Sequence, residues 1–324
     1  MSIVARAGGG SPSAILPCGK HLVAKKQSGL VSRARRKVTS VRESRARRKE
    51  ARRSRAAAQA AFLAVPRELC LVRAPDPPIS SPGMTDLLRV ATYNVHRWTG
   101  LNGRAEPDPA RACFVISELD ADVIALQEVL RPFEADDPLE KLADALGLHL
   151  AFATTRVHRL GDLGNAILSR WPIASVSKLE LPASRIERRA AVMARFDGVG
   201  ASLGIVATHL SLVDRTRHRQ VRELLEHPHL SSGPAILLGD MNAWRRCKAT
   251  RALEGALTGH HNLDWPASFP AAAPVLALDR VYARGARVVG VHAHVTPAAR
   301  RASDHLPVIA EIELKPAAAV RATG

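Results

Sequence analysis

The sequence predicts an α/β protein in which two packed β-sheets carry helices on their outer faces. From residue 87 onward, stretches with the apolar pattern of strands outnumber stretches with helical spacing. Short turns join many of the predicted strands. Polar residues of the kind that bind metal ions and phosphates close several of these strands, so we expect a chemical site along a sheet edge.

The first elements are predicted from hydrophobic spacing. Residues 88–95 alternate apolar and polar side chains, as a strand does. Residues 109–119 repeat apolar side chains at helical spacing and are expected to form a helix. Residues 122–129 form a nearly continuous apolar run, which predicts a buried strand. Residues 139–146 are expected to form a second helix that ends at Gly147, a residue suited to a helix C-cap.

The later elements follow the same rules. Four strands are expected next, at residues 164–169, 173–179, 191–196 and 203–210. Asp214 is expected to cap a helix that runs to Glu226. Four further strands are expected at residues 235–239, 278–282, 286–294 and 307–314. Residues 260–274 contain three prolines and are expected to form an irregular loop near the site.

The N-terminal segment differs in charge from the rest of the chain. The 324 residues carry a formal net charge of +17, and residues 1–83 contribute +14 of it through 18 Lys/Arg against 4 Asp/Glu. The remaining residues carry 29 against 26, so the high overall charge does not make the folded part a nucleic-acid binder. Residues 33–55 are dense in Arg, and this repulsion predicts disorder, or at most a marginal helix over residues 45–63.

Three explanations remain open for residues 1–83. They could be a tail that binds nucleic acid or an anionic surface, a transit peptide, or an extension upstream of a translation start at Met84. In each case we predict a basic, disordered tail at residues 1–83, one domain at residues 84–315 and a short disordered tail at residues 316–324.

The remaining global features are consistent with a monomeric cytoplasmic protein, which is what we expect. The sequence has no CxxC pair and suggests neither a zinc site nor a disulfide framework, because its four cysteines are far apart: Cys18, Cys70, Cys113 and Cys247. It also has no run of 18 apolar residues, so we expect no membrane-spanning helix and no stable membrane insertion.

Asp240 and Asn242 form the most informative pair in the chain. They follow the apolar run of residues 236–238 and Gly239. Residues two apart in an extended chain point the same way, so this carboxylate and this amide are expected to face one point. Asp240 can orient or deprotonate a water molecule that attacks phosphorus, and Asn242 can orient Asp240 or bind a phosphoryl oxygen.

Three other residues are candidate ligands of a divalent cation. Glu128 closes an apolar strand, where a charge is rarely left unpaired. Mg²⁺ prefers one or two carboxylates together with water and substrate oxygens. Asn94 follows the first strand and Asp304 precedes the last one, and either can bind the ion or its water. Taken singly, each could be an ordinary turn or surface residue, but their shared place at strand ends favours a site.

Two histidines and a further aspartate complete the candidate set. His305 is expected to carry a proton or to face the developing negative charge on phosphorus. His209 closes another apolar strand and is a second candidate contact to the phosphate. Asp279 lies at the start of a strand and can hold His305 in one tautomer by accepting from a ring N–H. The plain alternatives are a structural histidine and an Asp279–Arg280 salt bridge.

These residues make the chain resemble the endonuclease/exonuclease/phosphatase superfamily over about residues 87–314. The motifs that carry the resemblance are Thr92-Tyr93-Asn94-Val95-His96, Leu126-Gln127-Glu128-Val129, Gly164-Asn165-Ala166-Ile167-Leu168-Ser169, Thr208-His209-Leu210, Gly239-Asp240-Met241-Asn242, Leu278-Asp279-Arg280-Val281 and Ser303-Asp304-His305. They follow the order and spacing of that superfamily, and no catalytic position is substituted.

The resemblance implies a four-layer α/β sandwich with two mixed, mostly antiparallel β-sheets packed face to face and helices outside. It implies hydrolysis of a phosphoester by in-line water attack with Mg²⁺, for which Mn²⁺ could substitute. Metal ligation is assigned by resemblance to Glu128, Asn94 and Asp304. Catalytic roles are assigned to Asp240, Asn242, His305, His209 and Asp279. Asn165 is expected to organise the site, and Arg188 and Arg189 either grip a substrate anion or form a solvated pair.

The substrate class stays open at this stage. The leading expectation is a phosphodiesterase of the nuclease type. The domain is nearly neutral, but two basic clusters flank the motifs and keep a nucleic-acid substrate open: Arg215, Arg217, Arg219 and Arg222, and Arg245, Arg246, Lys248 and Arg251. The second is a lipid or small-molecule phosphodiesterase or phosphatase, with Trp98, Trp265 and Phe269 as candidate membrane contacts. A non-enzymatic alternative is a nucleic-acid-binding protein that acts through its basic tail.

Overall fold

The structure is a computed structural model, and it describes residues 43–50, 53, 70–133, 136–183, 187–197, 202–260 and 264–314. The chain divides into two compact units, residues 1–57 and residues 58–324. In the first unit, residues 43–50 form an exposed helix, within the region where the sequence predicts at most a marginal one. The rest of that region and the C-terminal residues 315–324 lie outside the described residues, so their predicted disorder stays a prediction.

Seven strands form the larger sheet of the second unit, in the order β1-β4-β5-β3-β2-β12-β11. Their bounds are β1 Leu71–Arg73, β2 Leu87–Asn94, β3 Val123–Pro132, β4 His149–His158, β5 Gly161–Ser169, β11 Ala286–Ala293 and β12 Val308–Leu314. Strands β2 and β3 are parallel, and the other neighbours are antiparallel. The carboxyl ends of β2 and β3 therefore lie at one edge of this sheet.

Five strands form the smaller sheet, in the order β10-β9-β8-β7-β6. Their bounds are β6 Ser175–Leu181, β7 Arg189–Asp197, β8 Ser202–His209, β9 Ala235–Asp240 and β10 Asp279–Arg284. Strands β8 and β9 are parallel, and the other neighbours are antiparallel. These five strands are consecutive in the chain, so the smaller sheet is inserted between β5 and β11 of the larger one.

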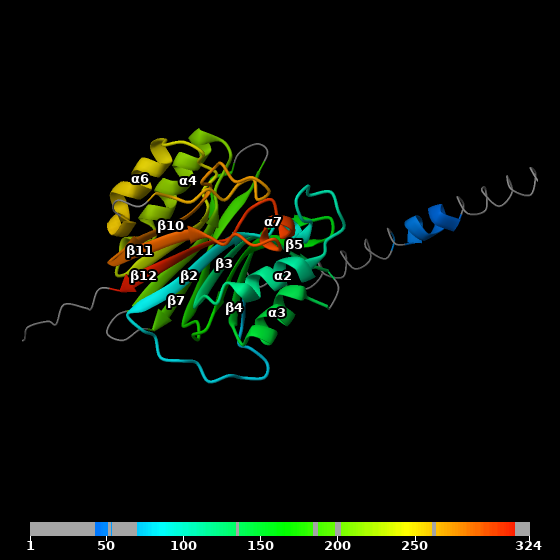
Figure 1. The fold of residues 1–324 in the computed structure, drawn as a ribbon, viewed down its shortest axis with the longest axis horizontal. Coiled ribbons are helices and arrows are strands. Elements are labelled where there is room, and N and C mark those ends of the chain that lie inside the picture. Colours follow the sequence, from blue (N-terminus) through cyan, green and yellow to red (C-terminus); the bar gives the residue numbers. More distant parts are fainter. Residues whose placement is uncertain are drawn as a thin grey trace, which may run out of the picture. The chain divides into compact units, whose positions relative to one another are not determined.

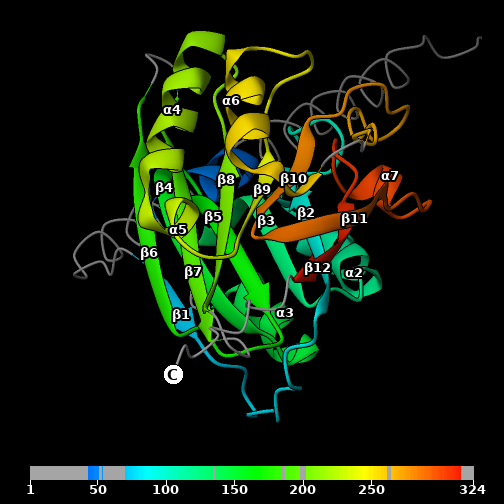
Figure 2. The same ribbon diagram turned by 90° about the vertical axis from the view of Figure 1, so that its left-hand side faces the viewer.

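Helices cover the outer faces of both sheets. The longer helices are α2 Pro109–Glu118, α3 Pro138–Leu146, α4 Asp214–Glu226 and α6 Lys248–Ala256. The short helical segments are η1 His96–Trp98, α5 Pro228–Ser231, η2 Thr258–His260 and α7 Ala299–Ala302. Helices α4 and α6 lie on one side of the molecule and α2 and α3 on the other, with the sheets between them (Figures 1 and 2). The predicted fold, a four-layer α/β sandwich, is confirmed.

The layers follow from the alternation of side chains along each strand. In β2, Val90 points into the core between the two sheets, whereas Ala91 and Tyr93 point into the core beneath α2 and α3. In β9, Leu238 enters the core between the sheets and Leu237 enters the core beneath α4 and α6. A strand can be apolar on both faces only when both faces are covered, and each fully buried Leu contributes about 1.5–3 kcal/mol.

The helix termini follow the local sequence with one difference. The side chain of Asp137 accepts from the backbone N–H of Leu139 at the start of α3, and Gly147 ends that helix with a left-handed φ of 63°, as predicted. At α4, however, the capping position is Val213, and the predicted cap Asp214 is the first helical residue. The carboxylate of Asp214 pairs instead with the guanidinium of Arg217, three residues later.

The sheet begins before the predicted domain boundary at Met84. Strand β1 pairs with β4 through Leu71 and Phe152, and Arg73 forms a 2.8 Å salt bridge with Asp144 of α3. Residues 71–73 therefore belong to the folded unit and not to the tail, which corrects the boundary. Local periodicity missed β1 because it is three residues long, and it missed β4 and α6 altogether. None of the described helices is long and apolar enough to cross a membrane.

Candidate active site

The predicted site residues come together where the carboxyl ends of three strands meet the start of a fourth. Asn94 ends β2, His209 ends β8 and Asp240 ends β9. Asp279 starts the antiparallel β10, and its Cα pairs in register with that of Asp240. A hydrogen bond of 3.1 Å from Asn94 Nδ2 to Asp240 Oδ2 joins the edge of the larger sheet to the edge of the smaller one. The site is therefore shared by both sheets.

Asp240 is the centre of the hydrogen-bond network. Its side chain is 1% exposed. Oδ2 accepts from Asn94, and Oδ1 accepts from the backbone N–H of Asn242 at 2.9 Å. The backbone of Asn242 has a φ of 50°, and this turn brings its N–H back onto Asp240. Both carboxylate oxygens are thereby fixed in direction.

The environment of Asp240 makes its carboxyl less acidic than usual. Burial raises the pKa of Asp240 to about 6, and the negative charge of Asp279 adds to the rise. The positive charge of His305 and the hydrogen bonds from Asn242 and Asn94 act in the opposite direction. Asp240 is consequently ionised at neutral pH but is a stronger base than an exposed aspartate.

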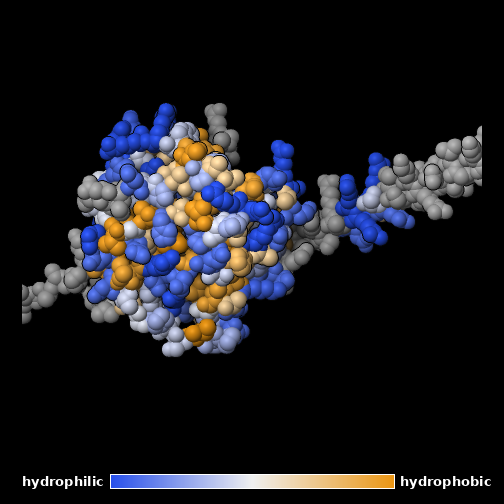
Figure 3. Space-filling model, in the orientation of Figure 1, coloured by the Kyte–Doolittle hydropathy of each residue, from blue (hydrophilic) through white to orange (hydrophobic). Residues whose placement is uncertain are grey.

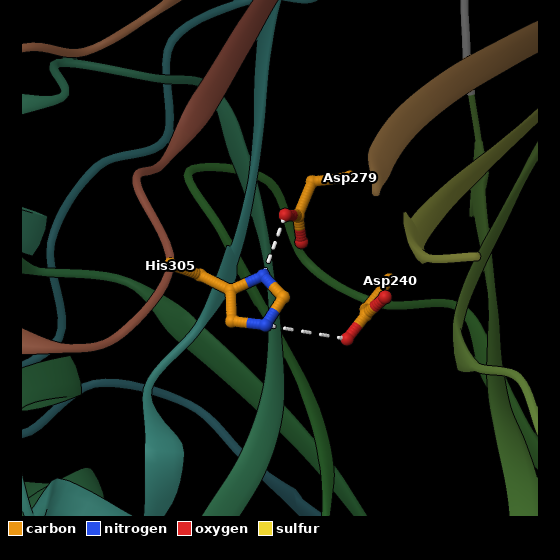
Figure 4. A group of neighbouring side chains, drawn as sticks. All are labelled: Asp240, Asp279 and His305. Carbon is orange, nitrogen blue, oxygen red and sulfur yellow. Dashed lines mark hydrogen bonds and ion pairs between the residues drawn. The ribbon is translucent and has the colours of Figure 1, made fainter. Parts of the chain in front are cut away.

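His305 lies between two carboxylates. Its Nδ1 is 2.7 Å from Asp279 Oδ2, and its Nε2 points toward Asp240 Oδ2 at 3.7 Å (Figure 4). The Ser268 hydroxyl donates to the same Asp279 oxygen at 2.6 Å. The ring of Phe269 packs against the imidazole with its centroid 5.0 Å away. These contacts fix the plane of the ring and direct Nε2 toward Asp240.

The charge of His305 follows from this arrangement. Burial alone would lower the pKa of His305, but the carboxylates of Asp279 and Asp240 outweigh burial and raise the pKa to about 10. His305 is therefore an imidazolium at neutral pH. Asp240, Asp279 and His305 place one possible ligand atom each within 4.8 Å of the others. Both nitrogens of the His305 ring already face carboxylates of the trio, which is the arrangement of a proton and charge array.

His209 is held as a neutral histidine beside Asp240. Its Nε2 lies 3.3 Å from Asp240 Oδ2 and 2.9 Å from Asn242 Nδ2. Asn242 Nδ2 also donates to the carbonyl of Leu210 at 3.0 Å, which fixes the amide. Burial lowers the pKa of His209 well below its ordinary value, and the positive charges of Arg189 and His305 lower it further. The site thus contains one charged and one neutral histidine.

Glu128 and Asp304 fit a divalent cation. Glu128 lies at a bulge in β3 with a φ of 53°, and its side chain is 21% exposed. Burial raises the pKa of Asp304; the charges of His305 and His96 oppose this effect, and the charge of Glu128 reinforces it. The two carboxylates are thus close enough to repel each other, and a cation between them would remove that repulsion. Asn94 Oδ1 is partly engaged, since it accepts from the backbone N–H of His96 at 3.0 Å.

Sequence reasoning missed three residues that touch this set. His96 Nδ1 lies 3.1 Å from Asp304 Oδ1, and Arg97 Nε lies 3.5 Å from Glu128 Oε2. His96 was visible only as part of a motif without a role, and nothing in the local sequence indicates Arg97. Ser268 was missed as well, because its contact with Asp279 spans an irregular loop.

Three further residues were expected at the site: Asn165, Arg188 and Arg189. Asn165 donates to the carbonyl of Ala190 at 2.7 Å, so it ties β5 to β7 at the site edge. Arg189 is half-buried, pairs with Glu187 at 2.5 Å and lies 3.4 Å from His209 Nδ1, whereas Arg188 is exposed. A small cavity of about 20 Å³ is lined by residues that include Glu128, Asn165, Arg188, Arg189 and His209.

Two groups of predicted surface residues need correction. Arg217 is 1% exposed, so it does not belong to a basic surface. Trp98 is 1% exposed, and its indole N–H donates to the carbonyl of Leu130 at 2.7 Å. Trp265 packs on Tyr282 with ring centroids 5.1 Å apart, and Phe269 packs on His305. Of the three aromatic residues predicted as membrane contacts, Trp98 is therefore buried, whereas Trp265 and Phe269 are half-buried and packed against neighbouring rings.

A four-layer sandwich whose two sheets share a buried site of aspartates, histidines, asparagine and glutamate defines a phosphoesterase fold. The chain belongs to the endonuclease/exonuclease/phosphatase family, whose family model matches residues 91–305. Members of this family are in general hydrolases of phosphoesters.

Similar proteins agree with this assignment. The uncharacterized protein YbhP of Escherichia coli K12 is 31% identical over 255 residues, which cover 70% of this chain and 96% of YbhP. The structure of an endonuclease/exonuclease/phosphatase from Beutenbergia cavernae is 26% identical with a TM-score of 0.57, covering 70% of this chain and 72% of that one. D. rerio TDP2, solved with a single-strand DNA product, shares the fold at 15% identity and a TM-score of 0.51, covering 70% and 98%.

Proposed function

We propose that the chain is a divalent-metal-dependent phosphodiesterase of the nuclease type, which hydrolyses its substrate by in-line attack of water. One observation carries the proposal: the buried carboxylate of Asp240 faces the imidazole of His305, and Asp279 holds that imidazole in place. A base and a cation directed at one point are what an attack of water on a phosphodiester needs.

Asp240 is assigned to the attacking water. With a pKa of about 6 it is ionised at pH 7, and it is still basic enough to accept a proton as the water attacks. Asn94 and Asn242 hold its two oxygens, so the carboxylate does not need to reorient during the reaction. Their assigned role is to position Asp240, and Asn242 also positions His209.

The two histidines are assigned to the phosphate. His305 carries a positive charge that stabilises the negative charge gained by the phosphoryl oxygens during attack. Asp279 is a positioning residue, since it fixes the tautomer and direction of His305 from the side away from Asp240. His209 is neutral and contacts the same phosphate as a hydrogen-bonding group.

Glu128, Asp304 and Asn94 are assigned to the cation. Mg²⁺, when bound, neutralises charge on a phosphate oxygen and stabilises the leaving oxygen. The protein holds the carboxylates of Glu128 and Asp304 close together. Arg97 contacts Glu128, and His96 contacts Asp304. These contacts hold both carboxylates in a fixed orientation.

Among substrate classes, nucleic acid is the best supported. D. rerio TDP2 shares this fold, and its structure contains a single-strand DNA product. Of the aromatic residues predicted to contact lipid, Trp98 is buried and Trp265 and Phe269 are half-buried against other rings, which weakens the argument for a lipid substrate. The monomeric state and the cytoplasmic location stay predictions from the sequence.

The test uses the full chain with Mg²⁺ against supercoiled plasmid, single-stranded DNA, abasic-site duplex, RNA, an aryl phosphodiester and phospholipid head-group substrates. Asp240→Asn should lower turnover about a thousandfold, because it removes the base while keeping the size of the side chain. The matched control is Asp197→Asn, the same change at an exposed position at the end of β7. EDTA should abolish turnover, and Mg²⁺ or Mn²⁺ should restore it.

The results of this assay distinguish the proposed mechanism from its alternatives. Activity that survives EDTA contradicts the metal-dependent mechanism. Equal turnover by Asp240→Asn and Asp197→Asn contradicts the assigned base. Turnover of phospholipid or small phosphoesters alone supports the lipid or small-molecule alternative. Nucleic-acid binding that is lost only when residues 1–69 are deleted, with no hydrolysis of any substrate, supports a tail-driven binding protein.

A further inference from the structure

A basic cleft opens between the N-terminal turns of α4 and α6. Its volume is about 590 Å³. Five cationic residues line it: Arg215, Arg245, Arg246, Lys248 and Arg251. They come from α4, from α6 and from the loop before α6, so the positive groups stand on both walls. The only acidic residue in the lining is Asp214.

Most of this positive charge is not neutralised within the protein. Asp214 is engaged by the buried Arg217 and by Arg245 at 3.6 Å. Arg246 pairs with Glu254 at 3.1 Å. Arg215, Lys248 and Arg251 are exposed and take part in no ion pair within the part of the chain that the structure describes. Strongly hydrophilic side chains gather over α4 and α6 (Figure 3).

The cleft lies at the same sheet edge as the candidate active site. Helix α4 starts at residue 214, just after His209 ends β8, and α6 starts at residue 248, just after Asp240 ends β9. Asn242 and Arg245 are three positions apart, so their backbones lie within about 10 Å of each other. The positive ends of both helix dipoles point toward this edge and add to the attraction for an anion.

Trp244 gives the cleft an aromatic neighbour. It follows Asn242 by two positions and is 50% exposed. The guanidinium of Arg217 lies over the Trp244 ring, 5.8 Å from its centroid, in a cation–π contact. An exposed aromatic ring beside unpaired cations is the combination that binds single-stranded nucleic acid, since the cations track the phosphates and the ring stacks on a base.

We propose that this cleft binds the backbone of a single-stranded nucleic acid whose scissile phosphate lies at Asp240, and that Trp244 stacks on an unpaired base. The inference rests on the proposed phosphodiesterase activity and names its substrate class. The shape of the cleft favours a strand over an anionic bilayer, because a flat surface reaches only the rim, whereas a strand contacts cations on both walls. Four of the five cations are arginines, which bind phosphate through two N–H groups.

The test measures binding without hydrolysis, by fluorescence anisotropy of a labelled oligonucleotide of about 12 nucleotides, in the Asp240→Asn background with Mg²⁺. Arg215→Ala/Arg251→Ala removes two unpaired cations from the cleft. Arg219→Ala/Arg222→Ala removes the same charge from α4 outside the cleft and is the matched control. We expect the cleft variant to raise Kd about tenfold near 0.1 M salt and to reduce the slope of log Kd against log salt by about 1.4, with little change in the control.

A second pair of variants tests the stacking. Trp244→Ala should raise Kd about tenfold, and Trp244→Phe, which keeps an aromatic face, should retain most of the affinity. Cys247 lines the same cleft and provides a readout that needs no variant. Bound oligonucleotide should slow its alkylation by iodoacetamide and leave the rates at Cys70 and Cys113 unchanged.

The outcomes separate this inference from the proposed activity. If the cleft variant and its control bind the oligonucleotide equally, with equal salt slopes, the cleft does not hold the strand, even if Asp240 is required for hydrolysis of an aryl phosphodiester. If the cleft binds oligonucleotide but no nucleic acid is hydrolysed, the proposed activity fails and the binding site stands. Loss of binding to phosphatidylglycerol vesicles in the cleft variant, with no oligonucleotide binding, overturns the proposal in favour of a membrane.

Discussion

At the residue scale, the site depends on one imidazole placed between two carboxylates. Asp279 is 0% exposed and Asp240 is 1% exposed, so both charges act on His305 through a medium that screens them poorly. The contact with Asp279 is short, 2.7 Å, and that with Asp240 is long, 3.7 Å. Because of this difference in distance, we assign Asp279 to orienting the imidazole. Nε2 of His305 can then face a phosphate.

The Asp279→Asn variant should distinguish two effects of Asp279 on His305: the orientation of the imidazole and the electrostatic effect of the carboxylate charge. The amide keeps the size of the side chain but not its negative charge, so the pKa of His305 should fall from about 10. His305 is protonated below its pKa, so the alkaline limb of kcat/KM against pH should move to lower pH. At pH 8 we expect kcat to fall about a hundredfold. An unshifted alkaline limb would show that His305 is not the group that must stay protonated.

The same variant has a consequence for stability. The pKa of His305 is raised in the folded state, so its contribution is fully present below about pH 6.5 and is lost as pH rises through about 10. Urea unfolding in EDTA should show this alkaline loss in the wild type and a weaker one in Asp279→Asn. Asp197→Asn should behave like the wild type throughout.

At the element scale, β9 is positioned by close contact with β8. Gly239 has a φ of 151°, and a Cβ at this position would lie 1.9 Å from the backbone oxygen of Thr208. Only glycine lets the two parallel strands pair up to their last residues, His209 and Asp240. The glycine beside Asp240 therefore sets the distance between two site residues.

Gly239→Ala should destabilise the fold by about 2–4 kcal/mol, because the added carbon meets backbone and not a movable side chain. Activity should fall with it, since Asp240 follows directly. The matched control is Gly255→Ala in α6, where a Cβ has nothing within 4 Å. This control should raise stability by about 0.5–1 kcal/mol. Urea unfolding of both variants checks the pair, and similar stabilities would contradict the close-contact argument.

The local sequence pattern predicts most of the helices and strands, but it does not predict contacts between segments that are far apart in the chain. Val90 and Ala91 enter different cores because a strand alternates, and the sequence displays that alternation. The candidate site residues are visible in the sequence because polar side chains adjoin apolar runs: Asn94, His209 and Asp240 close such runs, and Asp279 begins one. By contrast, β1 has only three residues, and Arg97 reaches Glu128 on another strand. Contacts between distant segments leave no local periodicity.

At the scale of the whole molecule, β1 protects one edge of the larger sheet. It pairs with β4, and Arg73 anchors it to α3 through Asp144. Without β1, the backbone N–H and C=O groups along that side of β4 would be unpaired, and an exposed edge invites pairing with other chains. Residues before Met84 therefore matter to the fold, even though all the residues proposed to act in catalysis lie after it.

Truncation tests this role. A chain of residues 84–324 should unfold at lower urea concentration than a chain of residues 70–324, and it should aggregate more readily at equal protein concentration, because the β4 edge is open. The chain of residues 70–324 should match the full chain in both respects. Equal urea midpoints for the two truncated chains would mean that β1 adds nothing to stability, and a translation start at Met84 would then be structurally sufficient.

The strands of the smaller sheet lie in the chain between strands of the larger one, and this order has a consequence for folding during translation. The smaller sheet is made from consecutive strands, whereas β12 inserts between β2 and β11 and is the last of the described strands to be synthesised. A nascent chain on the ribosome therefore holds β2 with one side unpaired until residue 314 has emerged. His305 arrives in that same final segment. A chain that terminates before residue 305 thus lacks both β12 and the imidazole that faces Asp240.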